Sequence, residues 1–185
     1  KNIALKGDTL VLFYGFETYI SKDRGDTYLQ IQTLNGPSAK FFFKEDSLIW
    51  IDFKTIYSSP DLGITWQPVY STALSITDVI LIDSTMLKCE MEFGTFVLNI
   101  SKSEDGGYTW SGLLAPGNFF NSAKLLGDGD NLFLWDGNGG NILYSSADGG
   151  YSWTSVGNYT VNGQLYFFND VLFFARGGDV LISSD

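Results

Sequence analysis

The chain has 185 residues, with 21 acidic and 11 basic side chains, no His, and a formal net charge of −10. This charge argues against nucleic acid or an anionic membrane as a partner. The absence of His excludes imidazole metal sites and His-based catalytic triads.

Cysteine content and hydropathy further limit the kind of protein that this chain can be. The lone Cys89 excludes an internal disulfide, and we expect no cofactor and no metal site. No apolar run approaches the length of a membrane span, and no signal peptide is visible. Because the chain begins with Lys1, we expect that a leader was removed or lies outside the sequence.

Short apolar segments separated by turn residues predict a chain built of strands. In the first two units these are Asn2–Lys6, Leu10–Tyr14, Thr18–Ser21, Tyr28–Gln32, Ala39–Lys44, Leu48–Ile51, Thr55–Ser58 and Trp66–Tyr70. In the third and fourth they are Asp78–Ile82, Met86–Glu92, Thr95–Ile100, Trp110–Leu114, Ala123–Leu126, Asn131–Trp135, Asn141–Ser145 and Trp153–Val156. The fifth unit offers Gln164–Phe168, Val171–Ala175 and Val180–Ser183. No helical period appears in any unit.

One motif, Ser-x-Asp-x-Gly-x-(Thr/Ser)-Trp, ends the third strand of each unit. In chain order the copies, which we call boxes 1 to 5, are Ser21–Tyr28, Ser59–Trp66, Ser103–Trp110, Ser146–Trp153 and the truncated Ser183–Asp185. Their Asp residues at positions 23, 61, 105, 148 and 185 are 38, 44, 43 and 37 residues apart. Units of roughly 40 residues with four short strands each are typical of propeller blades.

The sequence therefore predicts one all-β domain over 1–185, a β-propeller of four-stranded antiparallel blades. Five repeat units are visible, at about 1–34, 35–72, 73–116, 117–160 and 161–185, and the last is incomplete. The missing fourth strand predicts either a piece of a larger ring or a chain that associates through the open edge at Val180–Ser183. That partner would be another copy or a further C-terminal segment.

Each box residue has a structural interpretation. A short carboxylate accepts hydrogen bonds from turn N–H groups that have no ladder partner, glycine adopts positive φ, and Trp covers the apolar area beside the turn. The residues expected in these roles are Asp23, Asp61, Gly63, Trp66, Asp105, Gly107, Trp110, Asp148, Gly150, Trp153 and Asp185. One carboxylate per box is too few for a dedicated calcium loop.

The boxes resemble those of the Asp-box (BNR-repeat) propellers, the family that includes sialidases. The resemblance covers the whole chain and implies that the boxes lie on a rim away from any ligand site. Sialidases bind the substrate carboxylate with three arginines and use a Tyr–Glu pair and an Asp for catalysis. This chain has only Arg24 and Arg176, and Arg24 lies inside a box, so the arginine triad of a sialidase is missing.

A ligand is instead expected at the opposite blade ends, where the second loops lie. Alignment of the units places Asp52, Glu92 and Asp136 at equivalent positions there, with Glu17 and Arg176 close to that level. Phe16, Phe53 and Phe93 add aromatic surface, so the face has residue types that suit sugars or cations. The alternative is that these acids only keep the surface soluble.

The sequence thus predicts a non-catalytic binding or scaffold propeller on a secreted or virion surface, with a glycan or a protein as partner. One alternative is a sialidase-like glycoside hydrolase of which this chain is a fragment or a relic, because two carboxylates at a suitable separation suffice for glycoside hydrolysis. The other is a structural protein that assembles through an open blade edge.

Overall fold

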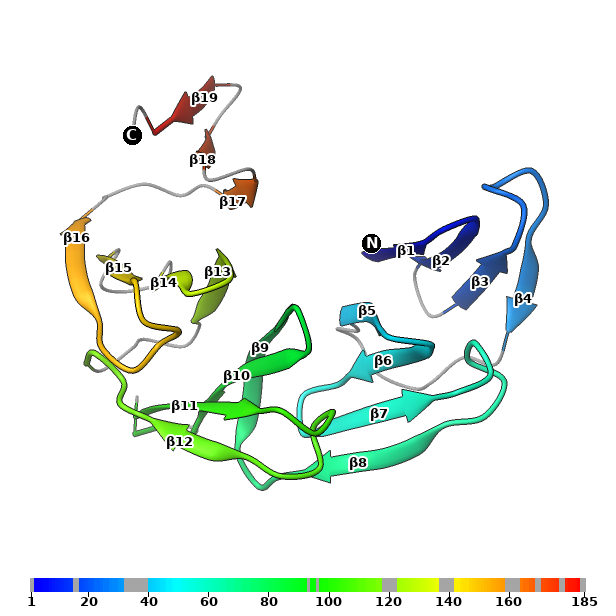
Figure 1. Cartoon of the computed structure of the whole chain (residues 1–185), viewed down its shortest axis with the longest axis horizontal. Coiled ribbons are helices and arrows are strands. Elements are labelled where there is room, and N and C mark those ends of the chain that lie inside the picture. Colours follow the sequence, from blue (N-terminus) through cyan, green and yellow to red (C-terminus); the bar gives the residue numbers. More distant parts are fainter. Residues whose placement is uncertain are drawn as a thin grey trace. The chain divides into compact units, whose positions relative to one another are not determined.

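The computed structural model describes residues 2–14, 17–31, 40–92, 94–95, 97–117, 123–136, 142–158, 164–168, 171–176 and 179–183. All regular secondary structure in these residues is β-strand, and the strands form five sheets (Figure 1). No helix that is long and apolar enough to cross a membrane occurs among them.

The strands follow one another in the sheets in chain order. Sheet 1 contains β1 (Asn2–Lys6), β2 (Thr9–Tyr14), β3 (Glu17–Ser21) and β4 (Leu29–Ile31). Sheet 2 contains β5 (Lys40–Lys44), β6 (Ser47–Ile51), β7 (Thr55–Ser59) and β8 (Gln67–Ser71). Sheet 3 contains β9 (Ser75–Ile82), β10 (Thr85–Met91), β11 (Leu98–Ser103) and β12 (Ser111–Leu113).

The last two sheets repeat the same order. Sheet 4 contains β13 (Lys124–Asp128), β14 (Asn131–Trp135), β15 (Ile142–Ser146) and β16 (Thr154–Asn158). Sheet 5 has three strands, β17 (Gln164–Phe168), β18 (Val171–Arg176) and β19 (Asp179–Ile182). The predicted fold class, a β-propeller of four-stranded antiparallel blades with an incomplete last unit, is confirmed.

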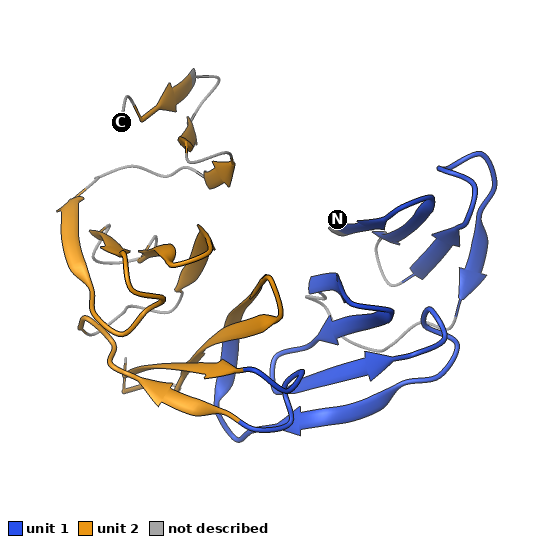
Figure 2. Ribbon diagram, viewed as in Figure 1, with its two compact units in different colours: residues 1–76, 104–109 blue, residues 77–103, 110–185 orange. Residues whose placement is uncertain are grey.

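The chain divides into two compact units (Figure 2). Unit 1 comprises residues 1–76 and 104–109, and so holds sheets 1 and 2 together with most of box 3. Unit 2 comprises residues 77–103 and 110–185, which form nearly all of sheet 3 and the whole of sheets 4 and 5.

Unit 1 is held together by one face of sheet 1 packed on one face of sheet 2. Ala4, Val11 and Phe13 of sheet 1 contact Phe41 and Trp50 of sheet 2 in a buried cluster. The ring centroids of Phe13 and Phe41 are 5.6 Å apart, and those of Phe41 and Trp50 are 6.4 Å apart. Aromatic pairs at such distances add to the stabilisation that comes from burial.

Unit 2 contains two such sheet-on-sheet clusters. Between sheets 3 and 4 the buried residues include Cys89, Ile100 and Leu134, and the side chain of Cys89 is completely buried. Between sheets 4 and 5 they include Trp135 and Leu165. Sheet 4 is thus apolar on both faces, which explains why Leu132–Trp135 shows no alternation of polar and apolar residues.

The structure corrects several predicted strand limits. The fourth strands of sheets 2, 3 and 4 begin one residue later than predicted, at Gln67, Ser111 and Thr154, because the box Trp still belongs to the turn. The third strand of sheet 3 is Leu98–Ser103 and not Thr95–Ile100. The reason is a turn before it, in which the N–H of Thr95 donates to the carbonyl oxygen of Glu92 at 3.3 Å.

The exposed edge of sheet 5 is β19, as the three-strand prediction implied. Val180, Leu181 and Ile182 on this strand are all exposed. Beyond β19 the N–H of Ser183 donates to the carbonyl oxygen of Leu172 at 2.9 Å, so the pairing with β18 continues one residue further.

The core clusters give the first prediction. Leu134→Ala removes a completely buried side chain between sheets 3 and 4 and should lower the free energy of unfolding by about 2–5 kcal/mol. Leu114→Ala, at an exposed position just after β12, is the matched control and should change it by less than about 0.5 kcal/mol. Equal losses in urea titrations of both variants would contradict this assignment of the core.

Candidate functional site

The box turns and the first hairpin turns lie at the same end of their sheets. In sheet 1 the N–H of Arg24 donates to the carbonyl oxygen of Asp8 at 3.0 Å, which joins box 1 to the β1–β2 turn. In sheet 4 the N–H of Gly149 donates to the carbonyl oxygen of Asp130 in the same way, also at 3.0 Å. Since the strands alternate in direction, the loops between second and third strands lie at the opposite end of each sheet.

Box 2 shows how the Ser, Asp and Thr side chains close the turn. The Oδ1 of Asp61 accepts hydrogen bonds from the hydroxyl of Ser59 at 2.8 Å and from the N–H of Thr65 at 2.8 Å. Its Oδ2 accepts the hydroxyl of Thr65 at 2.7 Å. The hydroxyl oxygen of Ser59 in turn accepts the N–H of Gly63 at 2.7 Å. Two side chains therefore satisfy two main-chain donors that lack a ladder partner.

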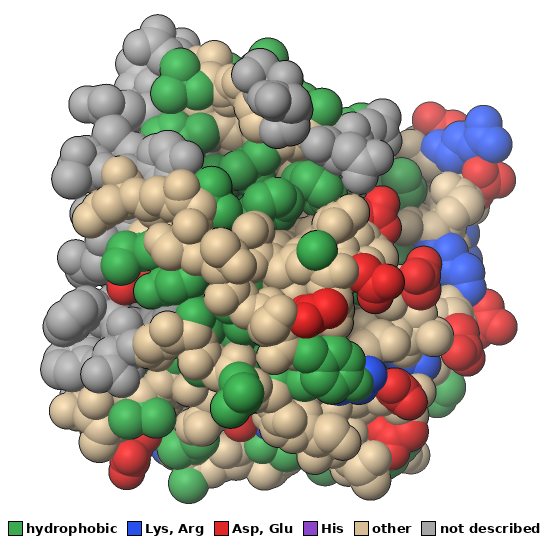
Figure 3. Space-filling view, turned by 60° about the vertical axis from the view of Figure 1, so that its left-hand side comes forward, with side chains coloured by type: hydrophobic (Ala, Val, Ile, Leu, Met, Phe, Trp, Pro, Cys, Tyr) green, Lys and Arg blue, Asp and Glu red, His purple; other side chains and the backbone are tan. Residues whose placement is uncertain are grey.

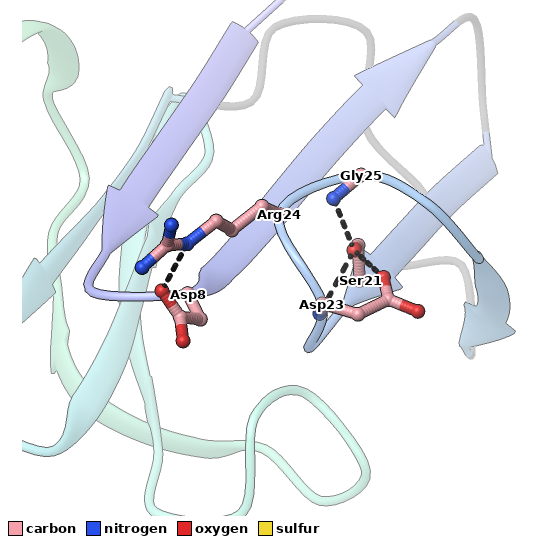
Figure 4. Close-up of polar contacts among 5 residues, drawn as sticks. All are labelled: Asp8, Ser21, Asp23, Arg24 and Gly25. Atoms are coloured by element: carbon pink, nitrogen blue, oxygen red, sulfur yellow. Dashed lines mark hydrogen bonds and ion pairs between the residues drawn. The ribbon is translucent and has the colours of Figure 1, made fainter.

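The same contacts recur in the other described boxes. In box 1 the Asp23 carboxylate accepts the N–H and hydroxyl of Thr27. The hydroxyl oxygen of Ser21 accepts the N–H of Gly25, as Figure 4 shows. In box 3 Asp105 accepts the N–H and hydroxyl of Thr109 at 2.9 and 2.6 Å. In box 4 Asp148 accepts those of Ser152 at 2.9 and 2.6 Å. Asp185 of box 5 lies outside the described residues.

In each of boxes 1 to 4, two consecutive residues have positive φ, where only the second was expected to. Gly63, Gly107 and Gly150 have φ of 90°, 98° and 93°. The residue before each also has positive φ, and in boxes 1 and 2 that residue is Arg24 or Leu62, both at 62°. The backbone of a residue other than glycine rarely has positive φ, and it keeps this conformation when the surrounding contacts enforce it.

In boxes 2 and 4 the Trp that ends the box packs beside the box glycine. A Cβ on Gly63 would lie 3.3 Å from Cζ2 of Trp66, and one on Gly150 would lie 3.5 Å from Cζ2 of Trp153. Trp66 packs against the core of unit 1 and Trp153 against the cluster between sheets 3 and 4. In sheet 3 the Nζ of Lys88 lies 4.6 Å from the ring centroid of Trp110.

The hydrogen bonds of the boxes also set the acidity of their carboxylates. Bonds from the hydroxyl and N–H of Thr27 lower the pKa of Asp23 to about 2, and bonds from Ser152 lower the pKa of Asp148 to about 2. The pKa of Asp61 is lowered for the same reason. Each bond favours the ionised carboxylate, because only that form accepts at both oxygens.

A surface ion pair accompanies box 1. The Nε of Arg24 lies 2.6 Å from Oδ1 of Asp8, and both side chains are largely exposed (Figure 4). Solvent-exposed pairs of this kind add little to stability. Arg24 is therefore engaged at the box end of sheet 1.

At the opposite end of sheet 2, Asp52 organises the loop that follows β6. Its Oδ1 accepts the N–H of Lys54 at 2.7 Å and the N–H of Thr55 at 2.6 Å. The N–H of Asp52 donates to the carbonyl oxygen of Thr55 at 3.0 Å. Asp52 thus has a turn-stabilising role.

The chain segment after β8 lies against this loop and fixes it. The N–H of Thr72 donates to the carbonyl oxygen of Lys54 at 3.0 Å, and the N–H of Ile76 donates to that of Phe53 at 2.7 Å. Phe53 is 50% exposed between these anchored groups. We call Asp52–Lys54 together with Thr72–Leu74 the Phe53 platform.

The other residues that were predicted to bind a ligand have different environments. Glu17 opens β3, is exposed, and accepts the hydroxyl of Tyr19 at 2.6 Å. Glu92 directly follows β10 and is exposed. Asp136 directly follows β14 but is only 2% exposed, so it does not belong to an accessible acidic face as expected. Arg176 is the last residue of β18, and its side chain lies outside the described part, as do Phe16 and Phe93.

Asp52, Glu92 and Asp136 therefore share a register position, the first residue after the second strand of their sheets. The structure brings Asp52 beside Phe53 and Lys54 in unit 1. Within the described residues, no group of three or more Cys, Asp or Glu side chains could hold a metal ion.

Sequence reasoning missed a buried ion pair on β10. The Nζ of Lys88 lies 2.8 Å from a carboxylate oxygen of Glu90, and both side chains are almost completely buried. Burial lowers the pKa of Lys88, and the contact with Glu90 partly opposes this. The sequence Lys-Cys-Glu within an apolar strand could have predicted this pair, because the side chains of residues i and i+2 lie on the same face of a strand.

No protein-family model matches the chain, and no curated protein matches it. Among solved structures, it is similar to a GH74 enzyme of Niastella koreensis, with a TM-score of 0.70 and 17% identity over 100% of this chain and 30% of that chain. A chain of a nidogen/laminin complex has a TM-score of 0.72 and 12% identity over 98% of this chain and 74% of that chain. YCF48 bound to a D1 peptide has a TM-score of 0.50 and 18% identity over 98% and 76%.

The chain thus spans less than a third of the GH74 enzyme and about three quarters of the other two proteins. At these identities the similarity shows the fold alone, which is a β-propeller.

The box carboxylates predict an acid-dependent loss of stability. Because the pKa of Asp148 is about 2 in the folded state and 3.8 is the ordinary value, its bonds stabilise the fold above pH 4 and are lost as the pH falls toward 2. Asp148→Asn should therefore lower the free energy of unfolding at pH 6, and the difference from the parent protein should shrink between pH 4 and pH 2. A pH-independent difference in urea titrations would show that the charge of Asp148 is not what stabilises the turn.

The box glycines give a steric prediction. A Cβ on Gly63, at φ 90°, would lie 2.5 Å from Cδ1 of Ile31, whereas one on Gly7, at φ 55°, meets no atom within 4 Å. Gly63→Ala should cost about 2–4 kcal/mol and Gly7→Ala about 1 kcal/mol. Thermal or urea unfolding of the two variants measures the contrast, and equal costs would exclude the steric explanation.

Proposed function

We propose that this chain is a non-catalytic binding propeller of the Asp-box type that recognises a glycan or a protein surface outside a cell or on a virion. The observation that carries the proposal is the Phe53 platform. It presents a half-exposed aromatic ring at the sheet end opposite the boxes, between a carboxylate and an exposed ammonium group.

The platform has the properties of a preorganised contact surface. Hydrogen bonds already hold its backbone: the carboxylate of Asp52 accepts two loop N–H groups, the N–H of Asp52 donates to the carbonyl oxygen of Thr55, and two N–H groups beyond β8 donate to carbonyl oxygens of the loop. An aromatic ring on a fixed loop loses little conformational entropy on binding. A ring beside polar groups suits the apolar face and the hydroxyls of a sugar, or the mixed surface of a protein.

The structural neighbours support binding in general terms only. One is described as bound to a D1 peptide and another as part of a nidogen/laminin complex, while a third is a GH74 enzyme. For catalysis, a glycoside hydrolase needs two carboxylates that face the substrate. Of the acids predicted for that role, Asp52 is bound to its own loop and Asp136 is buried, which favours binding over hydrolysis.

Phe53→Ala tests the proposal on an array of immobilised oligosaccharides. We expect the parent protein to bind a subset of the sugars and the variant to bind them at least about tenfold more weakly, because the variant lacks the ring on which the apolar face of a sugar would stack. Stacking of a nucleic-acid base on an aromatic side chain, a comparable contact, contributes on the order of 1–3 kcal/mol. Ile64→Ala, an exposed apolar residue in box 2 at the other end of the same sheet, should bind like the parent.

Two results would contradict the proposal. If Phe53→Ala retained full sugar binding, the platform would not be the site. If the parent bound no sugar and a photo-reactive amino acid at position 53 cross-linked no protein on intact cells, the surface would not be a binding site at all.

A further inference from the structure

The Phe53 platform carries two opposite charges next to its aromatic residue in the chain. Asp52 precedes Phe53 and Lys54 follows it. Phe53 and Lys54 are exposed, while Asp52 is half-buried. All three residues belong to unit 1, as does the segment Thr72–Leu74. The platform is therefore defined within one compact unit of the chain.

The carboxylate of Asp52 is only partly used by its own loop. The N–H groups of Lys54 and Thr55 both donate to the same oxygen, Oδ1, at 2.7 and 2.6 Å. Oδ2 accepts no hydrogen bond within the described residues, and it is not among their buried unpaired oxygens, so it reaches the surface. Asp52 thus offers one oxygen to a ligand while the other keeps the loop in shape.

The ammonium group of Lys54 is available in the same way. Within the part of the chain that the structure describes it forms no ion pair and no hydrogen bond, and its side chain is exposed. By contrast, Lys6, Lys44 and Lys88 are each paired with a carboxylate. An ammonium group brings three N–H donors and no acceptor. Lys54 therefore offers donors to a ligand.

Hydroxyl groups suit this combination of an acceptor and a donor. A hydroxyl can donate to Oδ2 of Asp52 and can equally accept from the ammonium group of Lys54. A carboxylate on the ligand cannot donate and is repelled by Asp52, and an ammonium group on the ligand is repelled by Lys54. An uncharged sugar carries hydroxyls around an apolar C–H face, and that face can stack on Phe53.

The charge of the whole chain also disfavours an anionic ligand. The net charge is −10, and acidic side chains are prominent on the face drawn in Figure 3. The charges of Asp52 and Lys54 cancel, so the platform itself does not offset this negative charge. At about 0.1 M salt, repulsion between exposed charges extends over roughly 10 Å. An acidic glycan is therefore repelled on its approach to the platform.

The extent of the platform favours a sugar over a protein as ligand. A standard protein interface takes about 20–30 residues from each partner. The platform consists of two short segments, Asp52–Lys54 and Thr72–Leu74, and Phe53 is its one exposed large apolar residue. A single aromatic ring with one acceptor and one donor matches the size of a sugar unit.

We propose that the Phe53 platform binds an uncharged sugar unit of a glycan. This inference rests on the proposed binding function and adds to it the chemical class of the ligand. The sugar ring stacks on Phe53, one hydroxyl donates to Oδ2 of Asp52, and another accepts from the ammonium group of Lys54. Because the ligand carries no charge, the affinity depends little on the salt concentration.

Sugars that differ only in charge test the proposal. An array of uncharged, carboxylated, sulfated and amino oligosaccharides identifies the backbone that the parent protein binds best. Calorimetry then compares this oligosaccharide with the same molecule after oxidation of its primary hydroxyls to carboxylates. We expect the uncharged form to bind at least about tenfold more tightly, because the oxidised form brings like charges together. The difference should shrink at high salt, since salt screens the repulsion.

Two variants separate direct contact with the sugar from an effect on the loop. Asp52→Asn keeps an oxygen for the loop N–H groups but removes the charge, so the preference for the uncharged form should fall at least about fivefold. Lys54→Met removes the donors and should weaken binding of the uncharged form about tenfold. Lys22→Met removes the same charge at an exposed position in box 1 and should bind like the parent. Damage to the loop alone would weaken binding of both forms equally.

The outcomes distinguish this inference from the proposed function. If the parent binds sugars through Phe53 but prefers carboxylated, sulfated or amino sugars, the ligand class is wrong and the binding function stands. If Asp52→Asn and Lys54→Met both bind like the parent, the charged groups do not contact the sugar and the inference fails. If the parent binds no sugar, the inference also fails. A protein cross-linked at position 53 on intact cells then preserves a binding function, and its absence overturns both.

Discussion

The structure depends on the hydrogen bonds that an Asp carboxylate makes inside each of boxes 1 to 4. In box 2 the carboxylate of Asp61 holds the N–H and hydroxyl of Thr65, while Ser59 holds the N–H of Gly63. These bonds impose two successive residues of positive φ, and they do so even where the first of them is Leu62 or Arg24. Such a reversal returns the chain to the sheet edge and places Trp66 on the core. Local strain is tolerated because the surrounding contacts over-determine the turn.

The two ends of each sheet are consequently under different constraints. At the box end the same side chains make the same contacts in sheets 1, 2 and 4, so there is little freedom for a site to diversify. At the other end, equivalent positions have different environments. Asp52 is half-buried and holds its own loop, Glu92 is exposed, and Asp136 is buried. A repeat protein that keeps one end fixed can vary the other without losing its fold, which is where a binding surface is best placed.

The order and number of the strands could be predicted from the sequence, because each unit contains its own turn residues, apolar runs and box. A two-residue turn such as Gly7-Asp8, an apolar run and a box suffice to define three of four strands. The candidate site was less accessible. Alignment placed Asp52 and Asp136 at one register position, but burial depends on loops and neighbouring strands that alignment does not describe. The Lys88–Glu90 pair was not predicted, because a charged residue in an apolar strand is expected to face solvent unless its partner is identified.

The contrast between Ile3 and Phe41 shows a limit that applies to any protein of stacked sheets. The two residues hold equivalent register positions and both are apolar, yet Ile3 is 65% exposed and Phe41 is 6% exposed. Phe41 is covered by sheet 1, which packs on it. A repeat therefore encodes the chemistry of its two faces, but the neighbour of each face is decided by what stands next to it, in the same chain or in another.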